Sequence, residues 1–324
     1  MMIKIRGLTK KYGSHIAVDN LTLDIYENEV FGLLGSNGAG KTTTIHMLAT
    51  LLKPSSGSAT VNGYDIVSQP SRVRSSIGIV FQAPSSDDML TGYENLQLHS
   101  MLYSVPRNIR KQRIEEVLNL VGLTERKHDQ VKTYSGGMRR RLEIARGLLH
   151  KPKVMFLDEP TLGLDPASRE TMWRYIQRLV KEERMTVILT THYMEEADIL
   201  CNRIGIIDNG RIVALDTPKG LKAGLGGDVI RIKTQQQQQH QHYNNPDKIS
   251  QLDFVRKVEQ HDGFLIVSVN NAKRDLPILL RHVEAEMAES ASPTLNDVFI
   301  HLTGRNIKEQ EPEGGFAEKY AKYD

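Results

Sequence analysis

Residues 35–43 have the types and spacing of a loop that binds phosphate groups. An apolar run at 29–34 precedes them and a helix-like run follows, which is the strand–loop–helix setting that such a loop requires. Its glycines let backbone N–H groups approach phosphate oxygens, Lys41 can reach the β- and γ-phosphates, and Thr42 offers a hydroxyl to Mg²⁺. The alternative is a flexible glycine turn with a surface lysine. The candidate nucleotide-binding residues here are Gly35, Ser36, Asn37, Gly38, Ala39, Gly40, Lys41, Thr42 and Thr43.

A second apolar run, 154–157, ends in two adjacent carboxylates, Asp158 and Glu159. Ligands of open α/β sheets bind at the carboxyl ends of the strands, so both side chains are expected at the nucleotide. Asp158 suits the Mg²⁺ side of the site, and Glu159 is placed to take a proton from an attacking water. A positioned general base contributes a factor of about 10²–10⁴ in rate. The alternative is an acidic strand end that caps the next element or pairs with a surface lysine.

Another candidate anion site begins at Ser135. This residue can cap a helix over 138–149, and Gly136 and Gly137 expose the first amide groups of that helix. The same three residues are also an ordinary helix start, so they indicate a binding site only in combination with the phosphate loop. The arginine run 139–141 could suggest nucleic acid, but three consecutive helical residues point in different directions. We therefore interpret this run as a solvated helix face.

The elements that would position these groups alternate between strands and helices. Periodic apolar residues over 90–150 predict helices, turn signals at 62–63 and 208–210 predict hairpins, and Asp165 followed by Pro166 marks a helix start. We expect an α/β fold: a P-loop domain with a mostly parallel sheet covered on both faces, an antiparallel β subdomain and a helical subdomain at about 90–150. The expected strands lie within 3–34 and at 77–81, 154–157, 186–189, 203–207 and 211–215.

Composition changes after a glycine-containing linker at 222–227. We expect a nucleotide-binding domain over 1–222, a small α+β accessory domain over 228–304 and a frayed, charged tail over 305–324. A histidine pair, His240 and His242, lacks a third metal ligand and is interpreted as part of a polar, disordered loop. The elements expected within the accessory domain are strands at 229–233 and 264–269, the glutamine-rich loop at 235–245 and an amphipathic helix at 276–287.

The composition of the 324 residues is that of an ordinary globular protein, with 39% hydrophobic and 25% charged residues. A net charge of +3 is too small to indicate nucleic acid by itself. The one cysteine, Cys201, excludes an intrachain disulfide, suits a reducing compartment and is expected to be a small buried residue. No run approaches the ~20 apolar residues that span a bilayer, and the N-terminus lacks the apolar core of a signal peptide. Any membrane role is therefore expected to come through a partner.

The ordered motifs resemble those of the ATP-binding-cassette ATPases, and the resemblance covers roughly residues 1–220. It implies ATP and Mg²⁺ as cofactors, with each nucleotide held between two chains that associate head to tail. The usual leucine and glutamine at the ends of the signature stretch are replaced here by Tyr134 and Met138. The motifs that carry the resemblance are the phosphate loop, Gln82 after a strand, Ser135 with Gly136 and Gly137, Asp158 with Glu159, Gly163-Leu164-Asp165, and Thr191-His192.

The resemblance also implies roles for single residues. Ser135, Gly136 and Gly137 would contact the γ-phosphate held by the partner chain, and Asp165 would lie in the loop that couples the two sites. The other implied roles are adenine stacking by Tyr12, Mg²⁺ contact by Thr42, Gln82 and Asp158, and catalytic roles for Glu159 as general base, for His192 at the γ-phosphate and for Gln82 at the water. Plainer alternatives are a surface aromatic for Tyr12, a strand end for Gln82 and a hydrogen-bonded structural histidine for His192.

The stretches 134–141, 158–166, 191–198 and 293–304 are similar to the daunorubicin-resistance type of exporter ATPase. This predicts an ATP-hydrolysing subunit that forms a homodimer on binding ATP and powers export through a separate membrane permease, docked through the helical region. It would be cytoplasmic, peripheral on the inner face of the cell membrane, and would bind no nucleic acid. The alternatives are a soluble cassette ATPase acting on nucleic acid or ribosomes, and a metabolic kinase that uses the same loop.

Overall fold

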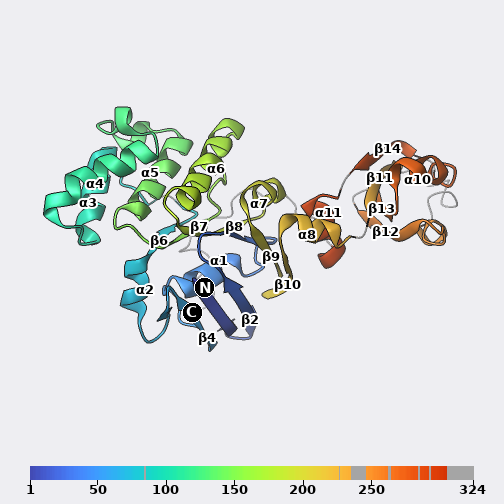
Figure 1. Cartoon of the computed structure of the whole chain (residues 1–324), viewed down its shortest axis with the longest axis horizontal. Helices are drawn as coiled ribbons and strands as arrows, with labels where there is room; N and C mark the ends of the chain where they lie inside the picture. Colours follow the sequence, from blue (N-terminus) through green and yellow to red (C-terminus); the bar gives the residue numbers. More distant parts are fainter. Residues whose placement is uncertain are drawn as a thin grey trace. The chain divides into compact units, whose positions relative to one another are not determined.

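The computed structural model describes residues 1–83, 85–225, 227–234, 246–261, 264–283, 285–291 and 293–304. The chain forms two compact units, one built on Met1–Leu215 and the other on Asp216–Lys308 (Figure 1). The predicted glutamine-rich loop at 235–245, with His240 and His242, and the predicted tail at 305–324 lie outside the described residues.

A six-stranded sheet forms the centre of the first unit, in the order β10-β9-β3-β8-β7-β6. The pairs β9/β3, β3/β8, β8/β7 and β7/β6 are parallel, which confirms the mostly parallel sheet. Three of these strands are buried along their whole length, as their uninterrupted apolar runs predict. The strands are β3 (Val30–Leu34), β6 (Ile77–Val80), β7 (Val154–Asp158), β8 (Thr186–Thr191), β9 (Arg203–Asp208) and β10 (Arg211–Asp216).

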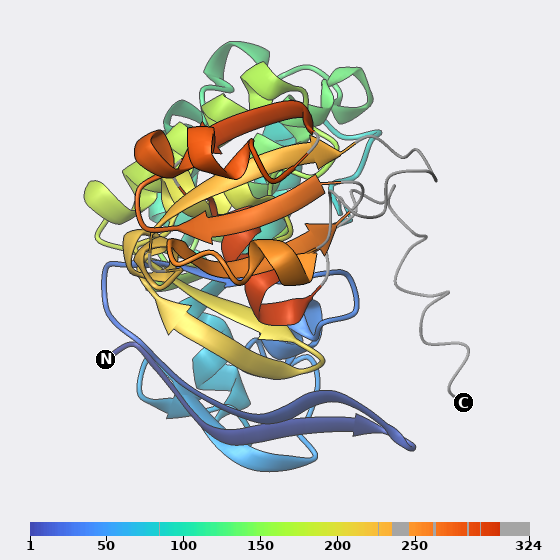
Figure 2. The same ribbon diagram turned by 90° about the vertical axis from the view of Figure 1, so that its right-hand side faces the viewer.

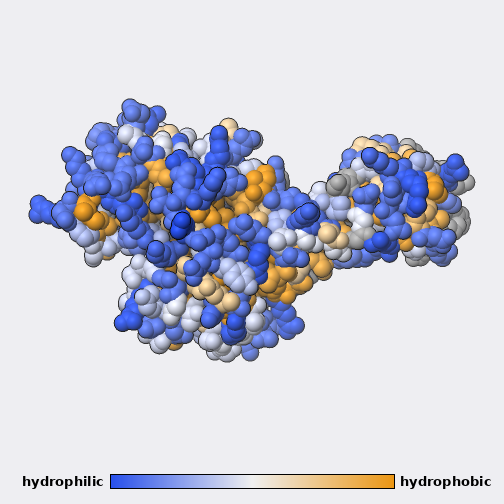
Figure 3. Space-filling model, viewed as in Figure 1, coloured by the Kyte–Doolittle hydropathy of each residue, from blue (hydrophilic) through white to orange (hydrophobic). Residues whose placement is uncertain are grey.

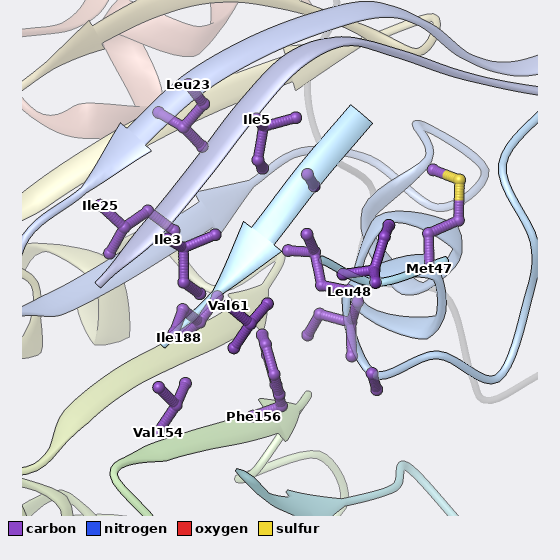
Figure 4. Packing of buried hydrophobic residues seen from close by; sticks show 14 of the residues in the cluster. Ile3, Ile5, Leu23, Ile25, Met47, Leu48, Val61, Val154, Phe156 and Ile188 are labelled. Atoms are coloured by element: carbon purple, nitrogen blue, oxygen red, sulfur yellow. The ribbon is translucent and has the colours of Figure 1, made fainter. Parts of the chain in front are cut away.

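An antiparallel sheet of order β2-β1-β4-β5 packs onto the central sheet, with the first helix, α1, between them. Its strands are β1 (Ile3–Tyr12), β2 (His15–Ile25), β4 (Ser56–Val61) and β5 (Tyr64–Asp65), and α1 spans Lys41–Leu48. The shared core contains Ile3 and Val61 from this sheet, Leu48 from α1, and Phe156 and Ile188 from the central sheet (Figure 4). This core fixes the start of α1, and hence the phosphate loop before it, against two sheets.

Helices α2, α5, α6 and α7 pack on the central sheet, and α3 and α4 pack on α5 at one end of the unit (Figure 1). The helices predicted over 90–150 are confirmed. Ser135 caps α5 and Asp165 caps α6, whose first residue is Pro166, as expected. The bounds are α2 (Pro70–Ser76), α3 (Gly92–Leu102), α4 (Arg107–Leu120), α5 (Gly136–Leu148), α6 (Pro166–Lys181) and α7 (Met194–Leu200), with short 3₁₀ turns at Thr124–Arg126 and Val131–Thr133.

The second unit is an antiparallel sheet of order β12-β13-β11-β14 with helices on both faces (Figure 2). Ile249 and Leu279 pack with Ile230 and other residues on one face, and Ile300 packs with two further strand residues on the other. The bounds are α8 (Pro218–Ala223), β11 (Asp228–Thr234), α9 (Pro246–Ile249), β12 (Val255–His261), β13 (Phe264–Val269), α10 (Ala272–Leu279), β14 (Ala285–Ala291) and α11 (Leu295–Thr303).

The predicted helix at 276–287 is wrong. The helix is α10, which begins after the cap Asn271 and ends at Leu279, and residues 285–291 form β14 instead. β14 pairs with β11, with Ala288 opposite Ile232. Apolar residues near 276–283 have helical spacing, but pairing with a distant strand decides the conformation of the following residues, and local periodicity carries no information about such pairing.

Cys201 follows α7 and is buried, as expected for a small apolar residue. A Cβ built on Gly32 of β3 would lie 2.6 Å from its Sγ, so the thiol fills the space that the glycine leaves. Burial raises the pKa of the thiol well above its usual value.

We therefore expect the native protein to resist alkylation of Cys201. Iodoacetamide at neutral pH should leave the folded chain unlabelled over hours and should modify the denatured chain once, as measured by intact mass. Rapid labelling of the folded protein, at the rate of a free peptide thiol, would contradict this account of Cys201.

Candidate nucleotide-binding site

The phosphate loop joins the end of β3 to the start of α1. Gly38 and Gly40 have φ of 81° and 105°, a region that favours glycine. A Cβ on Gly40 would lie 2.4 Å from the carbonyl oxygen of Ala17 in β2, so no other residue fits there without displacing that strand. The Lys41 ammonium is buried and donates hydrogen bonds to the carbonyl oxygens of Gly35 at 2.9 Å and Ser36 at 3.0 Å. The Lys41 side chain thus lies within the loop and links the start of α1 to residues 35–36.

The end of β7 places Asp158 beside this loop. Thr42 donates its hydroxyl to Asp158 Oδ1 at 3.1 Å, and Thr190 of the neighbouring strand β8 donates to the same oxygen at 2.5 Å. Hydroxyl and carboxylate oxygens are the ligands that Mg²⁺ prefers, so the oxygen donors of Thr42 and Asp158 fit this ion. Thr190 was not predicted; a hydroxyl within an otherwise apolar, buried strand was the available signal.

Glu159 follows with an unusual backbone conformation, a φ of 47°. Its amide donates to the carbonyl oxygen of Thr190 at 3.2 Å and to the Thr190 hydroxyl at 3.0 Å. One carboxylate oxygen lies 3.7 Å from Lys41 Nζ and 3.3 Å from His192 Nδ1. Burial by itself would raise the pKa of Glu159, but the contact with His192 and the charge of Lys41 outweigh it and hold the pKa below its usual value. The carboxylate is therefore ionised at neutral pH, as a general base must be.

Gln82 lies two residues beyond β6, whose last pair in register is Val80 with Leu157 of β7. This places it at the same carboxyl edge of the sheet as Asp158. Within the described part of the chain, its side chain forms no hydrogen bond to Thr42 or Asp158. The structure thus brings the Gln82 backbone to the site without fixing its side chain there.

The interpretation of 139–141 as a solvated face is wrong. Arg140 is buried and donates to the carbonyl oxygens of Asp158 at 2.7 Å, Glu159 at 2.9 Å and Pro160 at 2.9 Å. Arg139 is partly exposed and pairs with Asp88, whereas Arg141 donates to backbone oxygens at 121–122. The face of α5 that contains Arg140 packs against the strand ends. Gly137, Ile144 and Leu148 lie at helical spacing from Arg140, and this small and apolar stripe was the signal in the sequence that could have revealed the packing.

The signature residues lie at the start of α5. Ser135 accepts a hydrogen bond from the Met138 amide at 3.3 Å, and Ser135 and Gly136 are exposed. A Cβ on Gly137 would lie 2.7 Å from Ser168 Oγ in α6. Among the described residues, none of these contacts reaches the phosphate loop of the same chain. The exposed residues Ser135 and Gly136 are therefore separate from the cluster around Lys41.

The other predicted residues have simple placements. Tyr12 ends β1 at the tip of the β1–β2 hairpin, where Lys10 Nζ lies 5.0 Å from the centre of its ring. The same β2 strand contacts Gly40 through Ala17, so the hairpin adjoins the phosphate loop. Asp165 accepts from the Ser168 amide at 3.0 Å as the cap of α6. The residues that the structure gathers into one cluster are Lys41, Thr42, Asp158, Glu159 and His192.

A phosphate loop at the edge of a parallel sheet, with a paired aspartate and glutamate opposite it, defines a nucleotide-hydrolysing P-loop domain. Comparison with known proteins agrees: the ABC transporter family profile matches residues 18–162. The linearmycin resistance ATP-binding protein of Bacillus subtilis is 37% identical over 315 residues, covering 95% of this chain and 100% of the relative. The daunorubicin/doxorubicin resistance ATP-binding protein of Streptomyces peucetius is 38% identical, covering 96% and 95%.

Solved structures give the same result. The chain is similar to cbiO1 from Clostridium perfringens, with a TM-score of 0.64 and 29% identity over 68% of this chain and 90% of that one. It is also similar to the dimeric post-hydrolysis state of an ATP-binding cassette bound to ADP and Pi, with a TM-score of 0.61 and 27% identity over 67% and 98%. The chain belongs to the ABC transporter family and is an ATP-hydrolysing nucleotide-binding subunit. No helix among the described residues is long and apolar enough to cross a membrane.

Proposed function

We propose that the chain hydrolyses ATP as a homodimer that drives export through a separate integral membrane permease. The observation that carries the proposal is the division of the anion-binding groups. Lys41, Thr42, Asp158 and Glu159 form one cluster, whereas the exposed residues Ser135 and Gly136 have no contact with it in the described part of the chain. Two such chains placed head to tail would complete each site with groups from the other.

Within each site, the amides of the phosphate loop and Lys41 bind the β- and γ-phosphates. Thr42, Asp158 and Gln82 would hold Mg²⁺, which when bound neutralises charge on the phosphates. Glu159 accepts a proton from the attacking water, because its carboxylate is ionised and adjoins Lys41. His192 orients that carboxylate through the 3.3 Å contact and would contact the γ-phosphate.

The partner chain contributes the remaining contacts. Ser135, Gly136 and Gly137 of one chain bind the γ-phosphate held by the other, using the exposed start of α5. Tyr12 stacks on the adenine from the hairpin beside the phosphate loop. Asp165 caps α6 in the loop proposed to couple the two sites, and a Cβ built on Gly136 would lie 3.7 Å from Leu164 Cδ2 in that loop.

The helical part at 90–150 is proposed to dock on the permease. Leu98, Met101 and Leu102 of α3 are exposed, the last with 69% of its surface accessible, and apolar side chains are visible over this end of the unit (Figure 3). Exposed apolar groups of this size are typical of a protein-binding surface. Such docking places the chain at the cytoplasmic, inner face of the cell membrane.

The cargo class is inferred from relatives. Two of them are described as resistance proteins, for linearmycin and for daunorubicin or doxorubicin, so a drug, lipid or similar compound is the proposed cargo class. A soluble cassette ATPase that acts on nucleic acid or ribosomes is the second candidate. It predicts salt-sensitive binding of the purified chain to nucleic acid.

Capture of the tagged chain from native membranes tests the proposal. We expect an integral membrane protein to co-purify in amounts comparable to the chain, and the Leu98→Glu/Leu102→Glu variant to lose it while still hydrolysing ATP. Co-purification of ribosomal or nucleic-acid components alone, from membranes and cytosol alike, would contradict the export proposal.

A further inference from the structure

We propose that Arg140 is a positioning residue for hydrolysis: its guanidinium sets the backbone that carries Glu159 and ties that backbone to α5. The inference rests on the proposed role of Glu159 as general base. The phosphate-facing motifs do not include Arg140, and no hydrogen bond of the described residues joins it to the phosphate loop.

The contacts of Arg140 all go to main-chain carbonyl oxygens at the ends of two neighbouring strands. Nη2 donates to Asp158 and Glu159, and Nε donates to Pro160, all after or at the end of β7. Nη1 donates to Phe81 and, at 3.5 Å, to Gln82, just after β6. One planar, rigid donor group therefore fixes the carbonyl groups of residues 81–82 relative to those of residues 158–160.

The burial of this group argues that it has a specific purpose. Arg140 is 7% exposed, and among the described residues no carboxylate forms an ion pair with it. A buried guanidinium is costly, and here carbonyl oxygens accept its hydrogen bonds while the nearby carboxylates of Glu143 and Asp158 stabilise its charge without direct contact. An aliphatic residue would fill the same space at lower cost, so the hydrogen bonds to this backbone are the property that an arginine supplies.

Arg140 binds a segment of backbone that has a strained conformation at Glu159. Glu159 has a φ of 47°, a left-handed conformation that is strained for a non-glycine residue. Its amide is held by Thr190 and its carbonyl oxygen by Arg140 at 2.9 Å. Released from Arg140, this peptide could relax, and its carboxylate would move away from Lys41 and His192.

The same helix also holds the far end of the segment after Gln82. Glu143, one turn beyond Arg140, accepts hydrogen bonds from the Ser85 amide at 3.2 Å and the Ser85 hydroxyl at 3.0 Å, and it pairs with Arg146 at 2.8 Å. α5 therefore binds residues 81–82 through Arg140 and Ser85 through Glu143, and it also binds the Glu159 carbonyl oxygen through Arg140. A shift of α5, which begins at the signature glycines, displaces the general base and the Gln82 segment together.

The test compares Arg140→Gln and Arg140→Lys with the matched control Arg113→Gln, which removes a guanidinium that also binds backbone oxygens, those of Leu148 and Leu149, but none at the site. We expect Arg140→Gln to lower kcat by about 10²-fold, the effect of a displacement of roughly 1 Å at the reacting groups. The dissociation constant for ATP, measured by fluorescence titration, should stay within about threefold, because the hydrogen bonds of Arg140 go to the strand ends and not to the phosphate loop. Arg140→Lys should recover part of kcat, and Arg113→Gln should retain the wild-type kcat.

A double-mutant cycle with Glu159→Gln distinguishes positioning from general stability. Since Arg140 acts through Glu159, adding Arg140→Gln to Glu159→Gln should lower the residual rate by less than about twofold. Independent, multiplicative losses would overturn the proposal, as would unchanged kcat in both Arg140 variants. If Arg140→Gln does not fold, Arg140→Lys carries the same cycle. Absence of hydrolysis in the wild type and in Arg113→Gln would instead count against the proposed function.

Discussion

Replacing Glu159 with glutamine is expected to lower ATP hydrolysis by a factor of about 10²–10⁴, the contribution of a positioned general base. The carboxylate is ionised because the contact with His192 and the charge of Lys41 hold its pKa below the usual value against the effect of burial. An amide of the same size preserves the packing but cannot accept the proton of the attacking water. ATP binding should persist, and the variant should accumulate as a dimer in the presence of ATP and Mg²⁺.

A steady-state turnover assay measures the loss of hydrolysis, and the molecular mass from analytical sedimentation measures the accumulation of the dimer in the same sample. The matched control is Glu183→Gln, an exposed glutamate between α6 and β8, which should retain wild-type turnover. Near-normal hydrolysis by Glu159→Gln would show that another group takes the proton.

The Lys41→Ala variant should lose both nucleotide affinity and turnover. The ammonium lies 2.9 Å and 3.0 Å from two carbonyl oxygens of the phosphate loop, so it is already oriented toward the phosphates that the loop binds. Removing one preorganised hydrogen-bond donor that stabilises the charge of the transition state typically lowers the rate by a factor of about 10²–10³. The substitution also removes a positive charge 3.7 Å from Glu159, so the pKa of that carboxyl should rise.

Titration with a fluorescent ATP analogue and a turnover assay would measure both losses. Lys111→Ala serves as the control, since Lys111 is exposed on α4 and its removal should change neither quantity. Unaltered affinity together with unaltered turnover in Lys41→Ala would refute the assignment of the phosphate loop.

The phosphate loop, both carboxylates and the order of strands and helices were predictable because each depends on local sequence. Glycines that permit left-handed backbone, a cap such as Asp165 and buried runs such as 154–157 act over a few residues. The placement of Asp158 beside Thr42 followed from a general property of parallel sheets, whose carboxyl ends share one edge.

The errors concern contacts between distant segments. β14 forms because it pairs with β11, and nothing within 276–287 records that pairing. Arg140 binds oxygens of residues 81–82 and 158–160, and a run of three arginines looks the same whether its middle member faces solvent or the sheet edge. A hydrophilic residue that shares helical spacing with buried neighbours is the signal to examine in related sequences.

The central claim, a catalytic pocket shared by two chains, is tested most directly by mixing two inactive variants. One is Lys41→Ala. The other is Ser135→Asp, which keeps a good helix cap but places a negative charge against the γ-phosphate. A mixed dimer has one pocket with both defects and one intact pocket, so an equimolar mixture should regain up to about a quarter of wild-type turnover. If mixed dimers, isolated through two different affinity tags, hydrolyse no more ATP than either parent, each chain does not complete the site of the other and the account is contradicted.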